Sequence, residues 1–106
     1  MKNSVKLSVI IPVRNFEAQL SQLVETLEFV LIGYSILFEI IVCAAPNSDL
    51  GDLRNGSATQ ILESAREGRS YQLNDGAEKS SGEWLFFVHA DSVLDSNAIV
   101  ALLSAT

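Results

Sequence analysis

Lys6-Leu-Ser-Val-Ile-Ile-Pro12 is a short run of mostly apolar residues that ends in a proline. Because its apolar residues follow one another without alternation, the run predicts a strand buried on both faces, as in a parallel sheet. The period then changes: from Leu20 to Leu31 apolar residues recur at i, i+3, i+4, i+7, i+10 and i+11, one stripe of an amphipathic helix. Asn15 is expected to cap this helix and Gly33 to end it. The opening of the chain therefore predicts a buried strand followed by a helix.

The rest of the chain repeats this alternation. Phe38–Ala44 and Trp84–Val88 are further apolar runs, and Ala58–Ser64 is a less apolar one that we place near a sheet edge. A helix from Gly68 to about Ser80 has an inner stripe of small residues and is expected to lie close to the sheet. That stripe consists of Leu73, Gly76, Ala77 and Ser80. With a last helix after residue 95, the order predicts a Rossmann-like three-layer α/β/α fold with a mostly parallel sheet of about four strands.

The composition fits a single domain over residues 1–106. The chain has 7 Lys and Arg against 13 Asp and Glu, a formal net charge of −6. This balance argues against a nucleic-acid partner, because such binding depends on Lys and Arg that neutralise phosphates. Cys43 is the one cysteine, which excludes an internal disulfide framework and a zinc cluster and favours a reducing compartment. We therefore expect a cytoplasmic domain.

The longest apolar stretch, Phe29–Ala45, does not predict a membrane span. It is interrupted by polar residues and by Gly33, and it is shorter than the ~20 apolar residues that a spanning helix needs. We expect a helix end, a turn and a buried strand there. Peripheral attachment to the inner face of the membrane remains an open alternative.

Polar side chains follow three of the predicted strands, within residues 12–17, 44–49 and 89–92. Because ligands bind outside the carboxyl ends of the strands in such sheets, we expect these segments to share one rim. Arg14 and Arg69 supply positive charge there, and Arg69 stands at a helix start that favours an anion. With a carboxylate at Asp91, this pattern predicts a diphosphate bridged by a divalent metal. The glycine patterns of a P-loop or a dinucleotide fold are absent from the sequence.

Four pieces of the sequence resemble, in order, the N-terminal half of a family 2 glycosyltransferase, which has the GT-A fold and uses nucleotide-sugar donors. These pieces are Ser8–Glu17, Glu39–Val42 with Asn47–Asp49, Gly68–Ala77 with Gly82–Trp84, and Phe87–Asp91. The last piece is similar to the branch of the family that carries His-Ala-Asp in place of Asp-x-Asp. The resemblance covers nearly the whole chain.

The resemblance implies roles for individual residues. Those implied to bind the nucleotide-diphosphate sugar are Pro12, Val13, Arg14, Glu17, Asp49, Arg69, Asn74, Ala90 and Asp91. Asp91 would hold Mn²⁺ or Mg²⁺ against the donor diphosphate, with His89 beside it. The acceptor, a sugar or lipid-linked sugar, is unknown. In the family a second half carries the acceptor site and the catalytic base, so we expect this domain to lack that half and name no base.

Two positions depart from the family pattern. Ala44 stands where the family usually has an aspartate for the nucleotide base, and His89 replaces the first carboxylate of the metal motif. A neutral imidazole suits Mn²⁺ better than Mg²⁺. These departures keep a non-catalytic nucleotide-binding or assembly module open as an alternative. A sugar nucleotidyltransferase is a third possible function, but the sequence has no glycine- and lysine-rich phosphate loop after the first strand to support it.

The main site residues also have structural interpretations. Asp91 suits a turn cap, and His89 suits a hydrogen bond to a backbone carbonyl. Arg69 can pair with Glu67 or Asp75 at the surface, a contact that contributes ~0–1 kcal/mol. We also expect self-association, because a shortened sheet exposes an edge strand or an apolar face.

Overall fold

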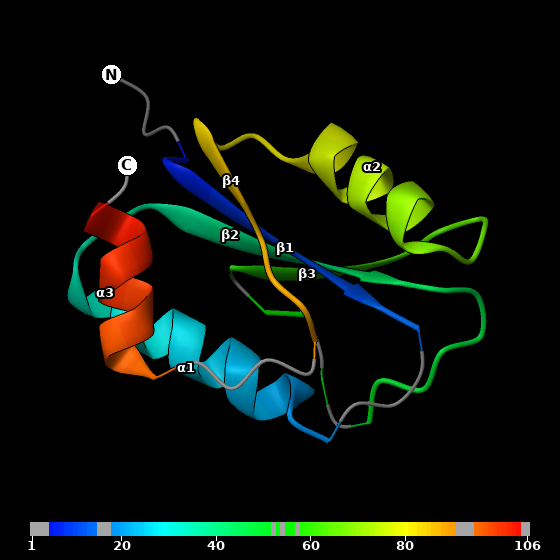
Figure 1. The fold of residues 1–106 in the computed structure, drawn as a ribbon, viewed down its shortest axis with the longest axis horizontal. Coiled ribbons are helices and arrows are strands. Elements are labelled where there is room, and N and C mark those ends of the chain that lie inside the picture. Colours follow the sequence, from blue (N-terminus) through cyan, green and yellow to red (C-terminus); the bar gives the residue numbers. More distant parts are fainter. Residues whose placement is uncertain are drawn as a thin grey trace.

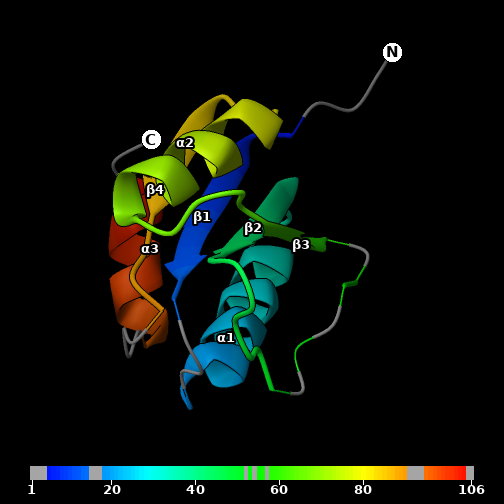
Figure 2. The same cartoon turned by 90° about the vertical axis from the view of Figure 1, so that its right-hand side faces the viewer.

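The computed structural model describes residues 5–14, 18–51, 53, 55–56, 58–90 and 95–104. The elements in chain order are β1 (Leu7–Val13), α1 (Leu20–Gly33), β2 (Phe38–Ala44), β3 (Thr59–Glu63), α2 (Arg69–Lys79), β4 (Trp84–Phe87) and α3 (Ser96–Ser104). The strands form one sheet in the order β3-β2-β1-β4, and every neighbouring pair is parallel. Helix α2 covers one face of the sheet, and α1 and α3 cover the other (Figure 1, Figure 2). The expected three-layer Rossmann-like α/β fold is confirmed.

The larger core lies between the sheet and helices α1 and α3. Alternate residues of β1 point into it and meet the apolar stripe of α1. All six stripe residues predicted between Leu20 and Leu31 are buried. Burial of each such side chain contributes about 1.5–3 kcal/mol, so this face supplies most of the apolar stabilisation of the domain.

On the other face, α2 packs closely against β1 and β2. The buried residues there are Ile10, Ile41 and Cys43, with Leu73 of α2 packed against them. A Cβ atom on Gly76 would lie 2.5 Å from Cγ2 of Ile10 and 2.6 Å from Sγ of Cys43. The absence of a side chain at Gly76 therefore lets the helix approach the sheet, as the small inner stripe predicts.

A polar network joins β1, β2 and the connection before β4 at the amino end of the sheet. The hydroxyl of Ser8 is buried and donates to Glu39 Oε2 at 2.6 Å. The same carboxylate oxygen accepts from the backbone N–H of Ser81, and Gly82 donates its N–H to Ser8 Oγ at 2.9 Å. These bonds hold the start of β4 beside β1.

Two details differ from the expectations, and a third agrees with them. Helix α1 begins at Leu20 after Gln19, whose side chain makes no capping bond, while Asn15 lies outside the described residues. Strand β4 is an edge strand, and Phe87 is 53% exposed, because α2 lies over β1 and β2 instead. Within the described ranges, no helix is long and apolar enough to cross a membrane.

Replacing Gly76 with alanine tests the close packing of α2. We expect Gly76→Ala to lower the free energy of unfolding by about 1–3 kcal/mol, because the new methyl group overpacks the contact with β1 and β2. Urea denaturation measures this change. Gly33→Ala is the matched control, since no heavy atom lies within 4 Å of a Cβ placed there. Equal stability of the two variants would contradict the tight contact.

The buried thiol of Cys43 makes stability depend on pH. Burial, with a smaller effect from Asp75, raises the pKa of Cys43 from 9.0 to about 12. The unfolded chain loses this proton near its ordinary pKa while the folded chain keeps it, so the stabilisation is complete below pH 9 and is lost as pH rises toward 12. The stability advantage of the native chain over Cys43→Ala should shrink by about 2 kcal/mol between pH 8 and pH 10.5. Urea titrations of both proteins at the two pH values measure this change. A difference in the free energy of unfolding that does not vary with pH would contradict a buried thiol at Cys43.

Candidate functional site

The carboxyl ends of the strands form one rim, held together by backbone and side-chain hydrogen bonds. The backbone N–H of Ala45 donates to Val13 O at 2.7 Å, and the hydroxyl of Ser48 donates to Arg14 O at 2.8 Å. On the other side of β1, the N–H of Val88 donates to Ile10 O at 3.0 Å. The structure thus brings together residues 12–14, 44–49 and 88–90, which are distant in sequence. Glu17 and Asp91 lie outside the described residues, so their positions relative to this rim stay predictions.

Gln72 joins helix α2 to the rim. Its side chain is fully buried, and Nε2 donates to Val13 O at 2.9 Å and to Cys43 O at 2.7 Å. Its Oε1 accepts from the backbone N–H of Gly68 at 3.2 Å. One amide therefore binds the ends of β1 and β2 and the residue before α2. This role is not predicted from the sequence, although Gln72 stands one helical turn before Gly76 and so shares its sheet-facing side.

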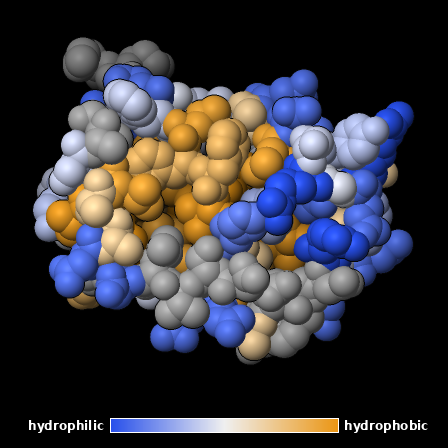
Figure 3. Space-filling model, in the orientation of Figure 1, coloured by the Kyte–Doolittle hydropathy of each residue, from blue (hydrophilic) through white to orange (hydrophobic). Residues whose placement is uncertain are grey.

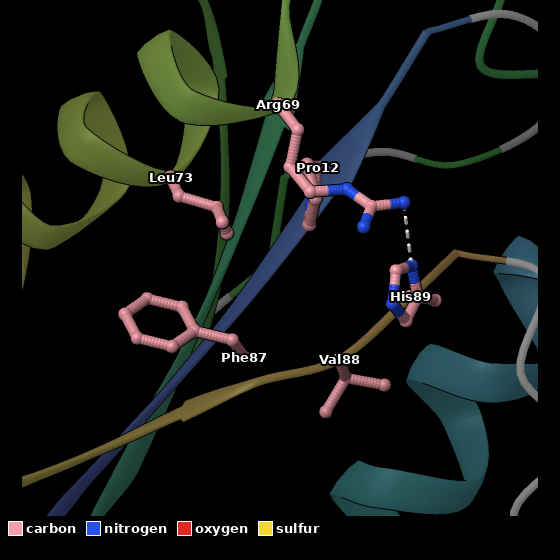
Figure 4. A pocket seen from close by; sticks show the side chains of 6 residues that line it. All are labelled: Pro12, Arg69, Leu73, Phe87, Val88 and His89. Carbon is pink, nitrogen blue, oxygen red and sulfur yellow. Dashed lines mark hydrogen bonds between the residues drawn. The ribbon is translucent and has the colours of Figure 1, made fainter.

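The first turn of α2 presents a positive charge to the rim. Gly68 precedes the helix with φ of 139°, a conformation that side chains disfavour. Arg69 follows, and its Nη2 lies 3.1 Å from Nδ1 of His89 (Figure 4). Because a guanidinium has only donors, Nδ1 accepts this bond and the ring proton resides on Nε2. Glu67 and Asp75, the two carboxylates expected to pair with Arg69 at the surface, take no part in this bond.

Arg14, and not Arg69, pairs with Glu67. Its Nη2 lies 2.9 Å from Oε2 of Glu67, and its Nε donates to the same oxygen at 3.0 Å. Both side chains are well exposed, so the pair is weak in solvent. An anion that approaches Arg14 therefore competes with Glu67 for the guanidinium at little energetic cost.

A cavity of about 150 Å³ lies between the first turn of α2 and the end of β4. It is lined by Pro12, Arg69, Leu73, Phe87, Val88 and His89 (Figure 4). We call it the Arg69 cavity. Its walls are apolar apart from the guanidinium and the imidazole, and a second hollow on the other side of Arg69 is lined by Arg14, Glu67 and Gly68. This arrangement can hold a flat apolar group beside an anion.

Several residues implied by the resemblance lie away from the cavity. Val13 and Ala90 are buried in the core on the α1 side, because alternate residues of a strand point to opposite faces. Asn74 was expected to face the pocket but is exposed on α2. Gln72 faces the sheet instead, since Gly76 sets which side of the helix meets the sheet. The carboxylate of Asp49 accepts the backbone N–H of Gly51 at 2.9 Å and so orders its own loop.

The described residues suit an anion at this point better than a cation. His89 is the described member of the expected metal pair, and its Nδ1 already accepts from Arg69. Binding a metal through Nε2 would require the ring proton to move to Nδ1, which breaks that bond, and the nearby guanidinium would repel the ion. Over the described ranges, no group of three or more His, Cys, Asp or Glu side chains is placed to hold a metal ion.

Comparison with known proteins adds no relative: no protein-family model matches the chain, and no curated protein matches it.

Gln72 is the residue whose replacement tests the rim. We expect Gln72→Leu to lower the free energy of unfolding by about 1–3 kcal/mol, because it leaves buried backbone groups without their partner. Chemical denaturation measures the loss. Asn74→Leu makes a similar polar-to-apolar change on the exposed side of the same helix and should stay within about 0.5 kcal/mol of the native chain. Similar losses in the two variants would contradict the bridging role of Gln72.

Proposed function

We propose that this domain binds the diphosphate of a nucleotide sugar, as the donor-binding part of a glycosyltransferase-type enzyme. The observation that carries the proposal is the exposed guanidinium of Arg69 at the first turn of α2, over an apolar cavity at the ends of β1 and β4. The sequence resemblance to family 2 glycosyltransferases points to the same rim.

The charges around Arg69 favour a diphosphate. The free N–H groups of the first turn and the positive end of the helix dipole add to the guanidinium charge. Arg14 lies across the neighbouring hollow and can turn from Glu67 toward a second phosphate. Two arginines that approach one hollow supply the charge that two adjacent phosphates need in an otherwise acidic protein.

The apolar walls of the Arg69 cavity suit the nucleoside. Pro12, Leu73 and Phe87 offer surfaces for van der Waals contact with a base or ribose. Ala44 is buried and has no carboxylate to accept hydrogen bonds from a base. We therefore propose that stacking and apolar contact, more than base-edge hydrogen bonding, hold the nucleoside, which implies weak discrimination between bases.

The proposal includes a divalent metal that Asp91 and the diphosphate would hold, without His89 as a ligand, because His89 Nδ1 accepts from Arg69. Such an ion would neutralise charge on the phosphate oxygens and polarise the bond to the leaving group. Glycosyl transfer to a sugar or lipid-linked sugar on the cytoplasmic side completes the proposal.

Isothermal titration calorimetry with UDP, GDP and their sugars, with and without Mn²⁺, tests the binding. We expect Arg69→Ala to weaken nucleotide binding by roughly 10- to 100-fold, the size of a lost charge-assisted hydrogen bond. Asp91→Ala should abolish the metal-dependent part of the binding. Lys79→Ala removes a positive charge from the other end of α2 and should leave the affinity unchanged.

The outcomes separate the proposal from its alternative. No heat of binding with any nucleotide at millimolar concentration would refute nucleotide binding and favour an assembly module. Binding without release of sugar from any donor would indicate a non-catalytic nucleotide-binding domain. An equal loss of affinity in Lys79→Ala and Arg69→Ala would show that the overall charge of the protein, and not the Arg69 cavity, attracts the ligand.

A further inference from the structure

The two edges of the sheet differ in how well they are protected. Edge strand β3 carries polar side chains, and Glu63 accepts a hydrogen bond from the backbone of Asn47 at 3.0 Å. Edge strand β4 has the sequence Trp-Leu-Phe-Phe, without charge, proline or bulge. Trp84, Leu85 and Phe87 are 42%, 38% and 53% exposed. Unprotected apolar edges of this kind pair with further strands.

The apolar surface around β4 extends beyond its backbone edge. Figure 3 shows an apolar band across the middle of the molecule, on the face where β4 runs in Figure 1. Leu85 and Phe87 point to the α2 side of the sheet, since their partners in β1 are Ser8 and Ile10. Helix α2 covers β1 and β2 there and leaves these two side chains exposed.

The backbone groups of β4 are oriented for pairing at its outer edge. Trp84 and Val88 donate their N–H groups to β1, to Lys6 O and Ile10 O, each at 3.0 Å. In a strand, alternate residues direct their N–H and C=O groups to opposite edges, so those of Leu85 and Phe87 face outward. Across the described ranges, no strand pairs with this outer edge.

We propose that a second copy of this chain pairs with this edge, so that two β4 strands run antiparallel across a two-fold axis at Phe86. The described strands of the two copies then form one continuous sheet. In this register Leu85 lies opposite Phe87 of the other copy, which places outward-facing backbone groups and apolar side chains of the same sheet face together. Trp84 lies opposite Val88 on the other face.

Charge favours the antiparallel direction of this pairing. Two copies with a net charge of −6 each repel one another, and β4 is an uncharged stretch where they can approach. The antiparallel register places Glu83 opposite His89 of the other copy, which is bonded to Arg69. A parallel pairing in register would place Glu83 beside Glu83 of the other copy. An antiparallel pairing centred one residue earlier, on Leu85, would place the charged Glu83 opposite the apolar Phe87 of the other copy.

A cysteine placed at the two-fold axis tests the register. Directly opposite residues of a non-hydrogen-bonded antiparallel pair have Cα atoms about 4.5 Å apart, within the range that a disulfide spans. We expect oxidised Phe86→Cys to form a covalent dimer on a non-reducing gel. Trp84→Cys is the matched control, because its two copies would lie about 14 Å apart along the strands. If Phe86→Cys does not fold, a mixture of Leu85→Cys and Phe87→Cys proteins makes the same test.

Light scattering across a concentration series tests the dimer itself. We expect the native chain to reach a dimer mass at high micromolar concentration, and Leu85→Lys to raise the dissociation constant at least tenfold. Phe29→Lys makes the same charge change at a residue that is 79% exposed on α1 and should leave the dimer intact. Glu83→Arg should weaken the dimer, and adding Arg69→Glu should restore it.

A monomer at every concentration would overturn the proposal and leave the edge available to a strand of another chain. A dimer that Phe29→Lys dissociates and Leu85→Lys does not would place the contact on α1 and also overturn it. Cross-linking of Trp84→Cys in preference to Phe86→Cys would overturn the register. Nucleotide binding does not enter these outcomes, so the function proposed above and this dimer can fail separately.

Discussion

The amide of Gln72 is the interaction on which the arrangement of the rim depends. It donates to carbonyl groups at the ends of two neighbouring strands and accepts from the residue before α2. Without such a partner, each of these buried carbonyl groups would cost about 1–3 kcal/mol. Because the bonds also orient the start of α2, they determine where Arg69 projects. A residue that does not line the Arg69 cavity thus positions the charge that faces it.

The positive charges of the rim are already partly engaged within the protein. Arg14 binds Glu67 and Arg69 binds His89, so a ligand must compete with an exposed ion pair and with a neutral imidazole. Both contacts are weak enough in solvent to be exchanged for a doubly charged ligand.

The main features of the fold follow from patterns that are visible in the sequence, because each depends on residues close together in the chain. Strand β2 was predicted with its bounds, and the stripe of α1 was predicted residue by residue. The exposure of strand β4 does not follow from such a pattern. Its apolar sequence fits a strand covered on both faces, and its exposure follows from the lateral position of α2, which local pattern does not encode.

The sequence by itself determined the order of strands and helices, the parallel sheet and the rim formed by residues 12–17, 44–49 and 89–92, of which the structure describes 12–14, 44–49 and 89–90. Periodicity and the rules of chain connection suffice for these features. Only the tertiary structure decided that Gln72 faces inward and Asn74 outward, that Arg69 binds His89, and that Glu67 binds Arg14. Those outcomes depend on how the close contact at Gly76 rotates α2 on the sheet, a matter of packing between segments far apart in the chain.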